Sequence, residues 1–295
     1  MKLNYNQFLA LVYADLFEYP LTYTELRRQV ISGSASLQPT LRTCVGLVGT
    51  KDGYYFLKGR GKIARLRNVR EKNSQKKYQI AVGVTKILTR VPTVEAIFLT
   101  GSVAVGNAKM AADIDLMVVT KSNTLWLTRF WVFGLLKSLK LLRSLKDYKD
   151  KVCPNIFLDT NHLEIKEKNL YTAHEVLQAK CLFDKGDVNY LWLKNNEWSK
   201  EYLPNAYKFR KLGELRDSDR QNYLTVRRSG VLSFLIYPIE LLLFVAQYFF
   251  MKRKITNEQV DWGYAFFHPR DLSDQTVKEF ERKVLRASKS FFSGS

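Results

Sequence analysis

Two aspartates separated by a single residue, Asp113 and Asp115, are the side chains in this 295-residue chain whose spacing most directly suggests chemistry. Positions i and i+2 of a strand point to the same side of a sheet, and an apolar run, residues 116–119, follows at once. Two neighbouring carboxylates repel each other unless a cation lies between them. Magnesium prefers one or two carboxylates together with phosphate oxygens and water. The pair therefore predicts a site for Mg²⁺ or Mn²⁺ and a phosphate compound.

A small-residue turn, Gly101-Ser102, lies shortly upstream, where another apolar run ends. Glycine allows the backbone to approach a phosphate closely, and serine adds a hydroxyl and an amide donor. A helix that begins just after Ser102 would add the donors of its N-terminus. We therefore expect Gly101 and Ser102 to bind phosphate groups beside the two aspartates.

The whole stretch of residues 95–120, EAIFLTGSVAVGNAKMAADIDLMVVT, resembles the signature of the nucleotidyltransferase superfamily, the polymerase-beta-like enzymes. The resemblance implies a core domain at residues 93–167. It also implies a reaction in which an acceptor hydroxyl attacks the α-phosphate of a nucleoside triphosphate, with magnesium assistance and release of pyrophosphate. In that reaction Asp113 and Asp115 would hold the metal ions, and Gly101 and Ser102 the β- and γ-phosphates.

The two-metal mechanism of this superfamily implies a third carboxylate on a later strand, and the sequence leaves its identity open. The next apolar strand, residues 154–159, offers Asp159, which would complete the catalytic set, or Asn155, a neutral ligand. Alternation along this strand places Asn155, Phe157 and Asp159 on one face. Glu164, beyond the following turn, is a third candidate. With Asn155 in this position the domain would be a slow enzyme or a nucleotide binder without turnover.

Composition sets outer bounds on function. The chain carries 47 Lys and Arg against 28 Asp and Glu, a formal charge of +19, which favours polyanions such as nucleic acid or nucleotide phosphates. Its apolar fraction of 46% is that of an ordinary globular protein. The three cysteines, Cys44, Cys153 and Cys181, form no CxxC pair, so neither a disulfide framework nor a zinc site is predicted. The first residues lack the features of a signal peptide, and we expect a cytoplasmic protein.

Residues 1–60 predict a winged helix-turn-helix module. Apolar spacing indicates a helix near residues 5–17 and a second at residues 23–30, which Thr22 and Glu25 would begin as a capping box. A third helix at residues 39–45 and a hairpin at residues 46–57 would complete it. Such a module either binds DNA or RNA or serves as a structural or protein-docking unit. The candidate nucleic-acid contacts are basic residues: Arg27, Arg28, Arg42, Lys58 and Arg60.

The remaining segments are predicted to be mainly helical. Residues 61–92 indicate a basic helical linker, residues 125–145 a helix behind the sheet, and residues 168–295 a helical C-terminal domain. His174 is expected to be a surface or core histidine rather than a base. Residues 230–251 approach membrane-spanning length but contain Pro238, Glu240 and Gln247, so we expect a buried helix or a homodimer contact rather than membrane contact.

Together these features predict an α+β protein of three parts that acts as a magnesium-dependent nucleotidyltransferase on a nucleoside triphosphate. The alternative is a nucleic-acid-binding winged-helix protein whose central domain binds nucleotide without turnover. The sequence names neither the acceptor nor the nucleotide base.

Overall fold

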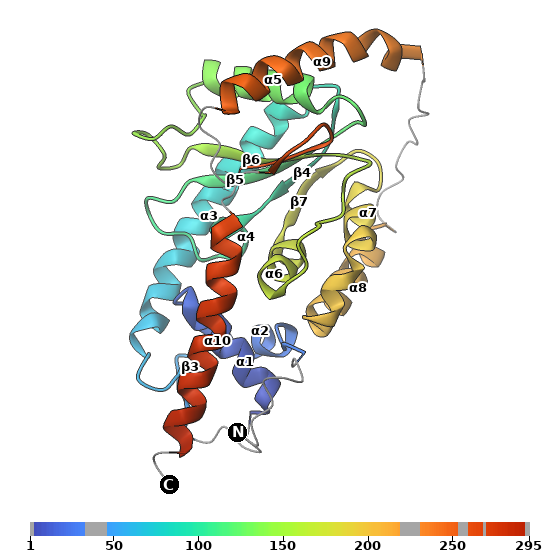
Figure 1. Cartoon of the computed structure of the whole chain (residues 1–295). Helices are drawn as coiled ribbons and strands as arrows, with labels where there is room; N and C mark the ends of the chain where they lie inside the picture. Colours follow the sequence, from blue (N-terminus) through green and yellow to red (C-terminus); the bar gives the residue numbers. More distant parts are fainter. Residues whose placement is uncertain (1–2, 33–45, 219–230, 253–258, 268–269, 293–295) are drawn as a thin grey trace.

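A six-stranded mixed sheet forms the centre of the computed structural model, which describes residues 3–32, 46–218, 231–252, 259–267 and 270–292 (Figure 1). The strand order is β7-β4-β5-β6-β9-β8. The bounds of these strands are β4 Val94–Leu99, β5 Ile114–Thr120, β6 Val152–Asp159, β7 Lys180–Asp184, β8 Gln259–Val260 and β9 Tyr264–Phe266. The fold is therefore of the predicted α+β kind.

The directions of the three central strands bring the candidate residues to one edge of the sheet. Strand β4 runs antiparallel to β5, with Leu99 opposite Leu116, so the end of β4 meets the start of β5. Strand β6 runs parallel to β5, with Ile114 opposite Val152, so the two strands start side by side. The turn after β4 and the first residues of β5 and β6 consequently meet at one place.

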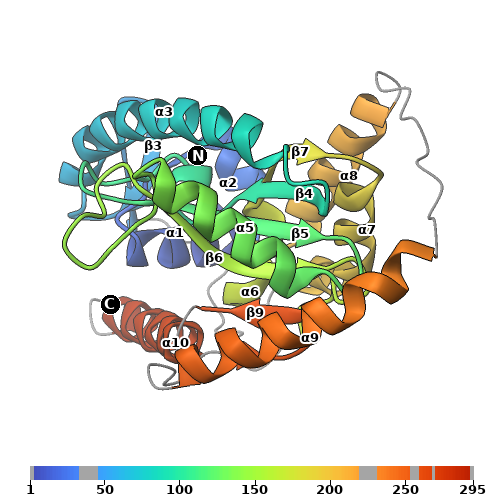
Figure 2. The same cartoon turned by 90° about the horizontal axis from the view of Figure 1, so that it is seen from above.

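Helices cover both faces of the sheet (Figures 1 and 2). One face buries a cluster that includes Ile97, Leu116 and Phe157 beneath α3 (Lys62–Leu88), α5 (Leu125–Ser138) and α9 (Val231–Lys252). The other face buries Phe98, Met117 and Leu158 in a second cluster. The elements on that side are α1 (Tyr5–Leu16), α2 (Tyr23–Arg28), α6 (Leu170–Gln178), α7 (Val188–Asn195), α8 (Pro204–Ser218) and α10 (Arg270–Phe292). Strand alternation thus divides the apolar side chains between two cores.

The N-terminal unit contains α1, α2 and a small antiparallel sheet of order β1-β3-β2. The strands are β1 Leu21–Thr22, β2 Val48–Lys51 and β3 Tyr54–Leu57. The predicted capping box is confirmed: the Glu25 amide donates to Thr22 Oγ1, and the Thr22 amide donates to the Glu25 carboxylate. The predicted third helix at residues 39–45, with Arg42, lies outside the described residues, so a winged helix is not shown.

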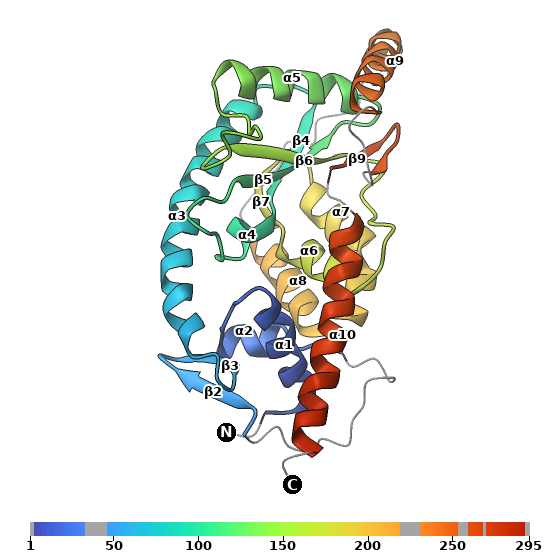
Figure 3. The same ribbon diagram turned by 60° about the vertical axis from the view of Figure 1, so that its left-hand side comes forward.

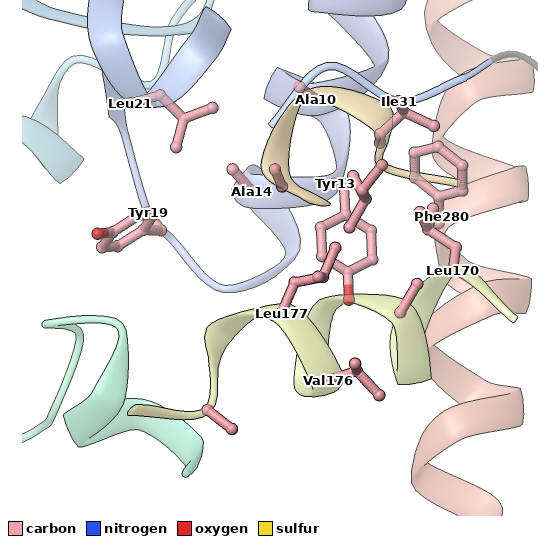
Figure 4. Packing of buried hydrophobic residues seen from close by; sticks show 14 of the residues in the cluster. Ala10, Tyr13, Ala14, Tyr19, Leu21, Ile31, Leu170, Val176, Leu177 and Phe280 are labelled. Atoms are coloured by element: carbon pink, nitrogen blue, oxygen red, sulfur yellow. The ribbon is translucent and has the colours of Figure 1, made fainter. Parts of the chain in front are cut away.

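This N-terminal unit shares its core with later parts of the chain. Tyr13 of α1 packs edge-on against Phe280 of α10, with ring centroids 5.8 Å apart, and Figure 4 shows both beside Leu170 and Val176 of α6. The same buried cluster continues to Phe98 on the sheet. The N-terminal residues and the C-terminal helix therefore complete one core rather than two separate ones.

The predicted basic linker is one continuous helix, α3, of 27 residues. Several of its basic side chains are buried and paired with carboxylates. Arg67 contacts Glu25 at 2.8 Å, and Lys77 is paired with Asp150. Those cations hold α3 against its neighbours, so they are not part of an exposed polyanion-binding strip.

The C-terminal region differs from its prediction in two respects. It is not purely helical, because β7, β8 and β9 extend the central sheet at both edges. Helix α9 is not buried either: Leu242 and Phe250 are 68% and 71% exposed. Among the described residues no helix has the length and apolar character needed to cross a bilayer.

Candidate active site

Gly101 forms the turn between β4 and the short helix α4 (Gly101–Ala104) and lies directly against Asp115. Its φ angle is +63°, a left-handed conformation that favours glycine. A β-carbon there would fall 2.5 Å from Oδ2 of Asp115. The Thr100 amide donates to the Asp115 carbonyl at 3.0 Å. Ser102 follows with a partly exposed side chain, so the predicted turn and the second aspartate are in contact.

Asp113 and Asp115 extend from the start of β5 to the same side, as the spacing predicts. Ligand atoms of Asp113, Asp115 and Cys153 all lie within 4.8 Å of one another. Burial raises the pKa of Asp115 to about 7, and the neighbouring carboxylates of Asp113 and Glu175 raise it further. A cation at this position would neutralise two charges that burial and mutual repulsion make costly.

Two side chains from later in the chain contact the acid pair. Asn155 donates from Nδ2 to Oδ1 of Asp115 at 2.8 Å. Arg143, in the loop between α5 and β6, places Nε 3.0 Å from Oδ2 of Asp113. Arg143 partly offsets the rise in the pKa of Asp115. The pair is thus held by one amide donor and one guanidinium.

Cys153, which the sequence interpretation did not select, lies directly beside the aspartates. The parallel pairing of β5 and β6 sets Asp115 opposite Cys153. Burial raises the pKa of the Cys153 thiol to about 11, so it is protonated at neutral pH. The position could have been found by aligning the starts of the two strands. It offers a thiol where the superfamily resemblance implied a carboxylate.

Asn155 reaches Asp115 because the register of β5 and β6 shifts between Leu116 and Met117. Strict alternation would place Asn155 on the same face as Phe157, which belongs to the opposite core. The shift adds one residue to β6 and re-aims its side chain, as strand irregularities do near functional sites.

Asp159 and Glu164 are not brought to the acid pair. Asp159 lies opposite Thr120, at the far end of β5. Its carboxylate accepts from the amides of Asn123 and Asn161 and contacts His162 Nδ1 at 2.6 Å. Glu164 is half exposed and paired with Lys168 at 2.7 Å. The structure therefore assigns both residues to local contacts.

A cavity of about 250 Å³ opens beside the site. Thr100 and Met117 form part of its wall, on the sheet face that also carries Asp115. The Thr100 hydroxyl is buried and has no hydrogen-bond partner among the described residues. The other lining residues come from α6, the loop before it, α7, β6, β9 and the start of α10: Ile156, Asn161, His162, Glu164, Ile165, Lys166, Glu167, Tyr171, Thr172, Glu175, Val176, Ala179, Trp192, Tyr264, Phe266, Leu272 and Ser273.

Glu175, on α6, brings a carboxylate to this cavity. Burial raises its pKa to about 7. Its charge also raises the pKa values of Asp115 and Tyr171, so the three groups share one low-dielectric region. Its neighbour His174 is buried against Tyr13, with stacked rings 4.0 Å apart, and burial lowers its pKa to about 3. His174 is therefore a neutral core histidine, as expected.

The candidate nucleic-acid contacts lie in the N-terminal unit, away from α5 and α9 (Figure 3). Arg27, Arg28 and Lys58 are exposed. Arg60 is instead paired with the buried Asp15 at 2.8 Å. Arg42 lies outside the described residues. Three of the five predicted contacts are thus available to a polyanion.

The donor set of the acid pair fits a divalent cation. Two adjacent carboxylates supply the hard oxygen ligands that Mg²⁺ or Mn²⁺ prefers. A protonated thiol at Cys153 is a poor ligand for such ions, and Nδ2 of Asn155 is a donor rather than a ligand. The residues present therefore fit a cation held by Asp113 and Asp115.

Comparisons with known proteins agree with this geometry. Residues 83–187 match the family described as Polymerase beta, Nucleotidyltransferase. The matched segment runs from the second half of α3 through β7 and includes the Gly101 turn, both aspartates and Glu175. The match supports nucleotidyl transfer as the general activity of this domain. No curated protein matches the chain.

Two solved structures share weak similarity with this chain. A crystal structure of a toxin-antitoxin with AMP-PNP is 18% identical, with a TM-score of 0.26, and the alignment covers 46% of this chain and 93% of that one. A mutant of the toxin-antitoxin MntA-HpeT is 17% identical, with a TM-score of 0.25 over the same shares of the two chains. Scores this low carry no argument about fold or function.

Proposed function

We propose that this chain is a divalent-metal-dependent nucleotidyltransferase that moves a nucleoside monophosphate from a nucleoside triphosphate to an acceptor hydroxyl. The single observation that carries the proposal is the contact between the Gly101 turn and Asp115, with Asp113 on the same side. That contact sets a backbone turn without a side chain against two acids, which suits a metal-bound triphosphate.

Each residue of the cluster has a distinct role in this proposal. Gly101 and Ser102 bind the β- and γ-phosphates through the backbone and the Ser102 hydroxyl. Asp113 and Asp115 hold Mg²⁺ or Mn²⁺, which would supply Lewis-acid polarisation of the α-phosphate. Asn155 orients the Asp115 carboxylate through its hydrogen bond. Arg143, now beside Asp113, can turn toward the phosphate charge.

Glu175 is the group that we assign to the acceptor. The acceptor oxygen attacks the α-phosphorus, its proton passes to Glu175, and the bond from the α-phosphorus to the bridging oxygen breaks so that pyrophosphate leaves. A carboxylate with a pKa near 7 can accept that proton at neutral pH. The position of Glu175 in the cavity wall makes the cavity the proposed acceptor site.

The cavity chemistry narrows the acceptor class. Tyr171, Tyr264 and Phe266 add aromatic surface to its wall, while Glu175 and the Thr100 hydroxyl add polar groups. A volume of about 250 Å³ accommodates a small molecule or one side chain. We therefore propose a compact, partly apolar hydroxyl compound, or a single hydroxyl-bearing side chain, as acceptor.

The decisive experiment uses each α-labelled nucleoside triphosphate with Mg²⁺ or Mn²⁺ and a panel of hydroxyl acceptors. Label transfer by the wild-type chain should be lost in the double variant Asp113→Asn/Asp115→Asn. It should fall by about 10²-fold or more in Glu175→Gln. A matched control, Asp147→Asn/Glu197→Gln, changes two exposed carboxylates and should retain full transfer. Transfer that persists in the first variant would refute the proposal.

One observation favours a second candidate, a nucleic-acid-binding protein whose central domain binds nucleotide without turnover. The thiol of Cys153 and the amide of Asn155 stand beside the acid pair, where a third carboxylate was expected. The exposed Arg27, Arg28 and Lys58 would then contact phosphates. This candidate predicts binding of DNA or RNA that weakens steeply as salt increases. Loss of that binding in Arg27→Ala/Arg28→Ala, with no transfer to any acceptor, would favour it.

A further inference from the structure

Helix α9 is fastened to α5 by a buried carboxylate. Glu240 accepts from the amides of Trp126 and Leu127 at 2.7 and 2.8 Å, in the first turn of α5. Amides in the first turn of a helix have no partner within the helix, so a carboxylate there satisfies them and interacts favourably with the helix dipole. Glu240 therefore fixes the rotation of α9 about its own axis.

A second polar residue holds the same orientation two turns further along. Gln247 donates from Nε2 to the Trp126 carbonyl at 2.9 Å and accepts from Arg129 at 2.5 Å. Glu240 and Gln247, which in the sequence argue against membrane contact, thus both face the protein. Their polar groups are engaged by α5 and leave the opposite side of α9 free of them.

The opposite side of α9 is entirely apolar. Every exposed residue from Tyr237 to Phe250 is aliphatic, aromatic or proline. The largest exposed fractions belong to Leu242, Phe249 and Phe250, at 68%, 65% and 71%. Monomeric proteins rarely expose a continuous apolar surface of this length, and such a surface marks an interaction site. We call this surface the α9 outer face.

The surroundings of the α9 outer face are aromatic and basic. Helices α5 and α9 lie side by side at one end of the molecule (Figures 1 and 3). Phe130 and Trp131 of α5 are also exposed there, each by about half. Residues 121–151 contain eight Lys and Arg against two Asp, and Lys137, Lys140 and Lys252 are exposed. Apolar and aromatic surface beside exposed lysines is the composition of helices that lie in an anionic bilayer interface.

We propose that the α9 outer face binds flat against an anionic lipid membrane. The helix does not cross the bilayer, because Glu240 and Gln247 keep one side of it on α5. A second copy of the chain is a poorer occupant, since two chains of charge +19 repel each other whereas an anionic leaflet attracts both. The proposal stands independently of the catalytic assignment.

The test is co-sedimentation of the purified chain with phosphatidylcholine vesicles, with and without phosphatidylglycerol. Wild-type chain should partition to the vesicles that contain phosphatidylglycerol, and much less to neutral ones. The variant Leu242→Ser/Phe250→Ser should bind these vesicles roughly tenfold or more weakly. The matched control Val69→Ser/Leu285→Ser alters two exposed apolar residues, 57% and 54% exposed, on α3 and α10 and should bind like wild type.

Two further measurements keep the result unambiguous. Circular dichroism checks that both variants fold, and quenching of tryptophan emission by brominated lipid reports membrane contact in the wild-type chain without any substitution. Light scattering gives the oligomeric state without lipid. Absence of wild-type chain from both kinds of vesicle would overturn the proposal. It would equally be overturned by a dimer that only Leu242→Ser/Phe250→Ser dissociates, which would identify a second copy as the occupant.

Discussion

Gly101 and Asp115 lie so close that a single added carbon at Gly101 would overlap the carboxylate, at 2.5 Å from Oδ2. The two residues belong to different elements, the turn after β4 and the second position of β5. Their contact joins the proposed phosphate-binding turn to the proposed metal site. Any change that moves the turn should therefore also move the carboxylate.

This contact predicts different effects for two glycine substitutions. Gly101→Ala combines a strained positive φ with a clash on Asp115, so it should destabilise the chain by about 2 kcal/mol or more and abolish transfer. Gly106→Ala shares a positive φ of +79° but meets no atom within 4 Å, so it should cost about 1 kcal/mol and keep transfer. Thermal unfolding and transfer assays compare the two. Equal activity in both variants would separate the turn from the site.

The pKa of Asp115 predicts how stability depends on pH without metal. Its folded pKa, about 7, lies above the unfolded value near 3.8, so the stability linked to this group is complete below pH 4 and is lost as pH rises to 7. Asp115→Asn removes this loss. The variant should gain stability relative to wild type as pH rises from 5 to 8, by on the order of 2 kcal/mol. Urea unfolding in EDTA measures the difference, and a constant difference across that range would contradict the raised pKa.

The acid pair predicts metal-linked stabilisation. Mn²⁺ should raise the unfolding temperature of wild type, since a ligand that binds only the folded state stabilises it. Asp113→Asn/Asp115→Asn should show no such rise. A concentration-dependent rise in this double variant would place the ion elsewhere.

Cys153 allows the reverse experiment. Cys153→Asp places a carboxylate opposite Asp115 and should tighten Mn²⁺ binding by about tenfold, on the order of 1.4 kcal/mol. Cys153→Ser, of similar size and neutral, is the matched control and should bind as wild type does. Calorimetric titration of Mn²⁺ at pH 8 gives the affinities. Weaker binding by Cys153→Asp would show that this position does not face the ion.

Glu240 predicts a stability effect far from the proposed active site. Glu240→Ala leaves the amides of Trp126 and Leu127 without a partner and should cost about 2–3 kcal/mol. The exposed Glu279→Ala on α10 should cost less than about 0.5 kcal/mol. Chemical denaturation compares both with wild type. An effect of Glu240→Ala as small as that of the control would indicate that α9 is held by its apolar contacts alone.

The acid pair and the turn could be predicted from the sequence because both depend on local patterns. Asp113 and Asp115 need only strand alternation to lie together, and Gly101 needs only the end of an apolar run. The roles proposed for these residues are still predictions, since the structure establishes their proximity and not their chemistry.

The residues beside the pair could not be predicted because they depend on pairing between distant strands. Cys153 adjoins Asp115 through the parallel register of β5 and β6, and Asn155 reaches it through the shift in that register. Alternation within one strand assigns neither. The same limitation made Asp159 a candidate, although the register sets it at the opposite end of the strand.

Helix α9 shows a different limit of sequence interpretation. Its mostly apolar composition predicted a buried helix, yet the direction of Glu240 and Gln247 decides which side faces the protein. Strands β7 and β9 were missed because they are five and three residues long and are stabilised only by the sheet they join. Local propensity carries little information about such strands.

The packing of α1 against α10 bears on the order in which the chain matures during synthesis. Asp15 of α1 is paired with both Arg60 and Lys283, so a buried charge near the start of the chain awaits a lysine in its last helix. Until α10 leaves the ribosome, the Tyr13 surface is uncovered and one cation of Asp15 is missing. The nascent chain should therefore depend on chaperones until α10 emerges, and cooperative folding should begin only then.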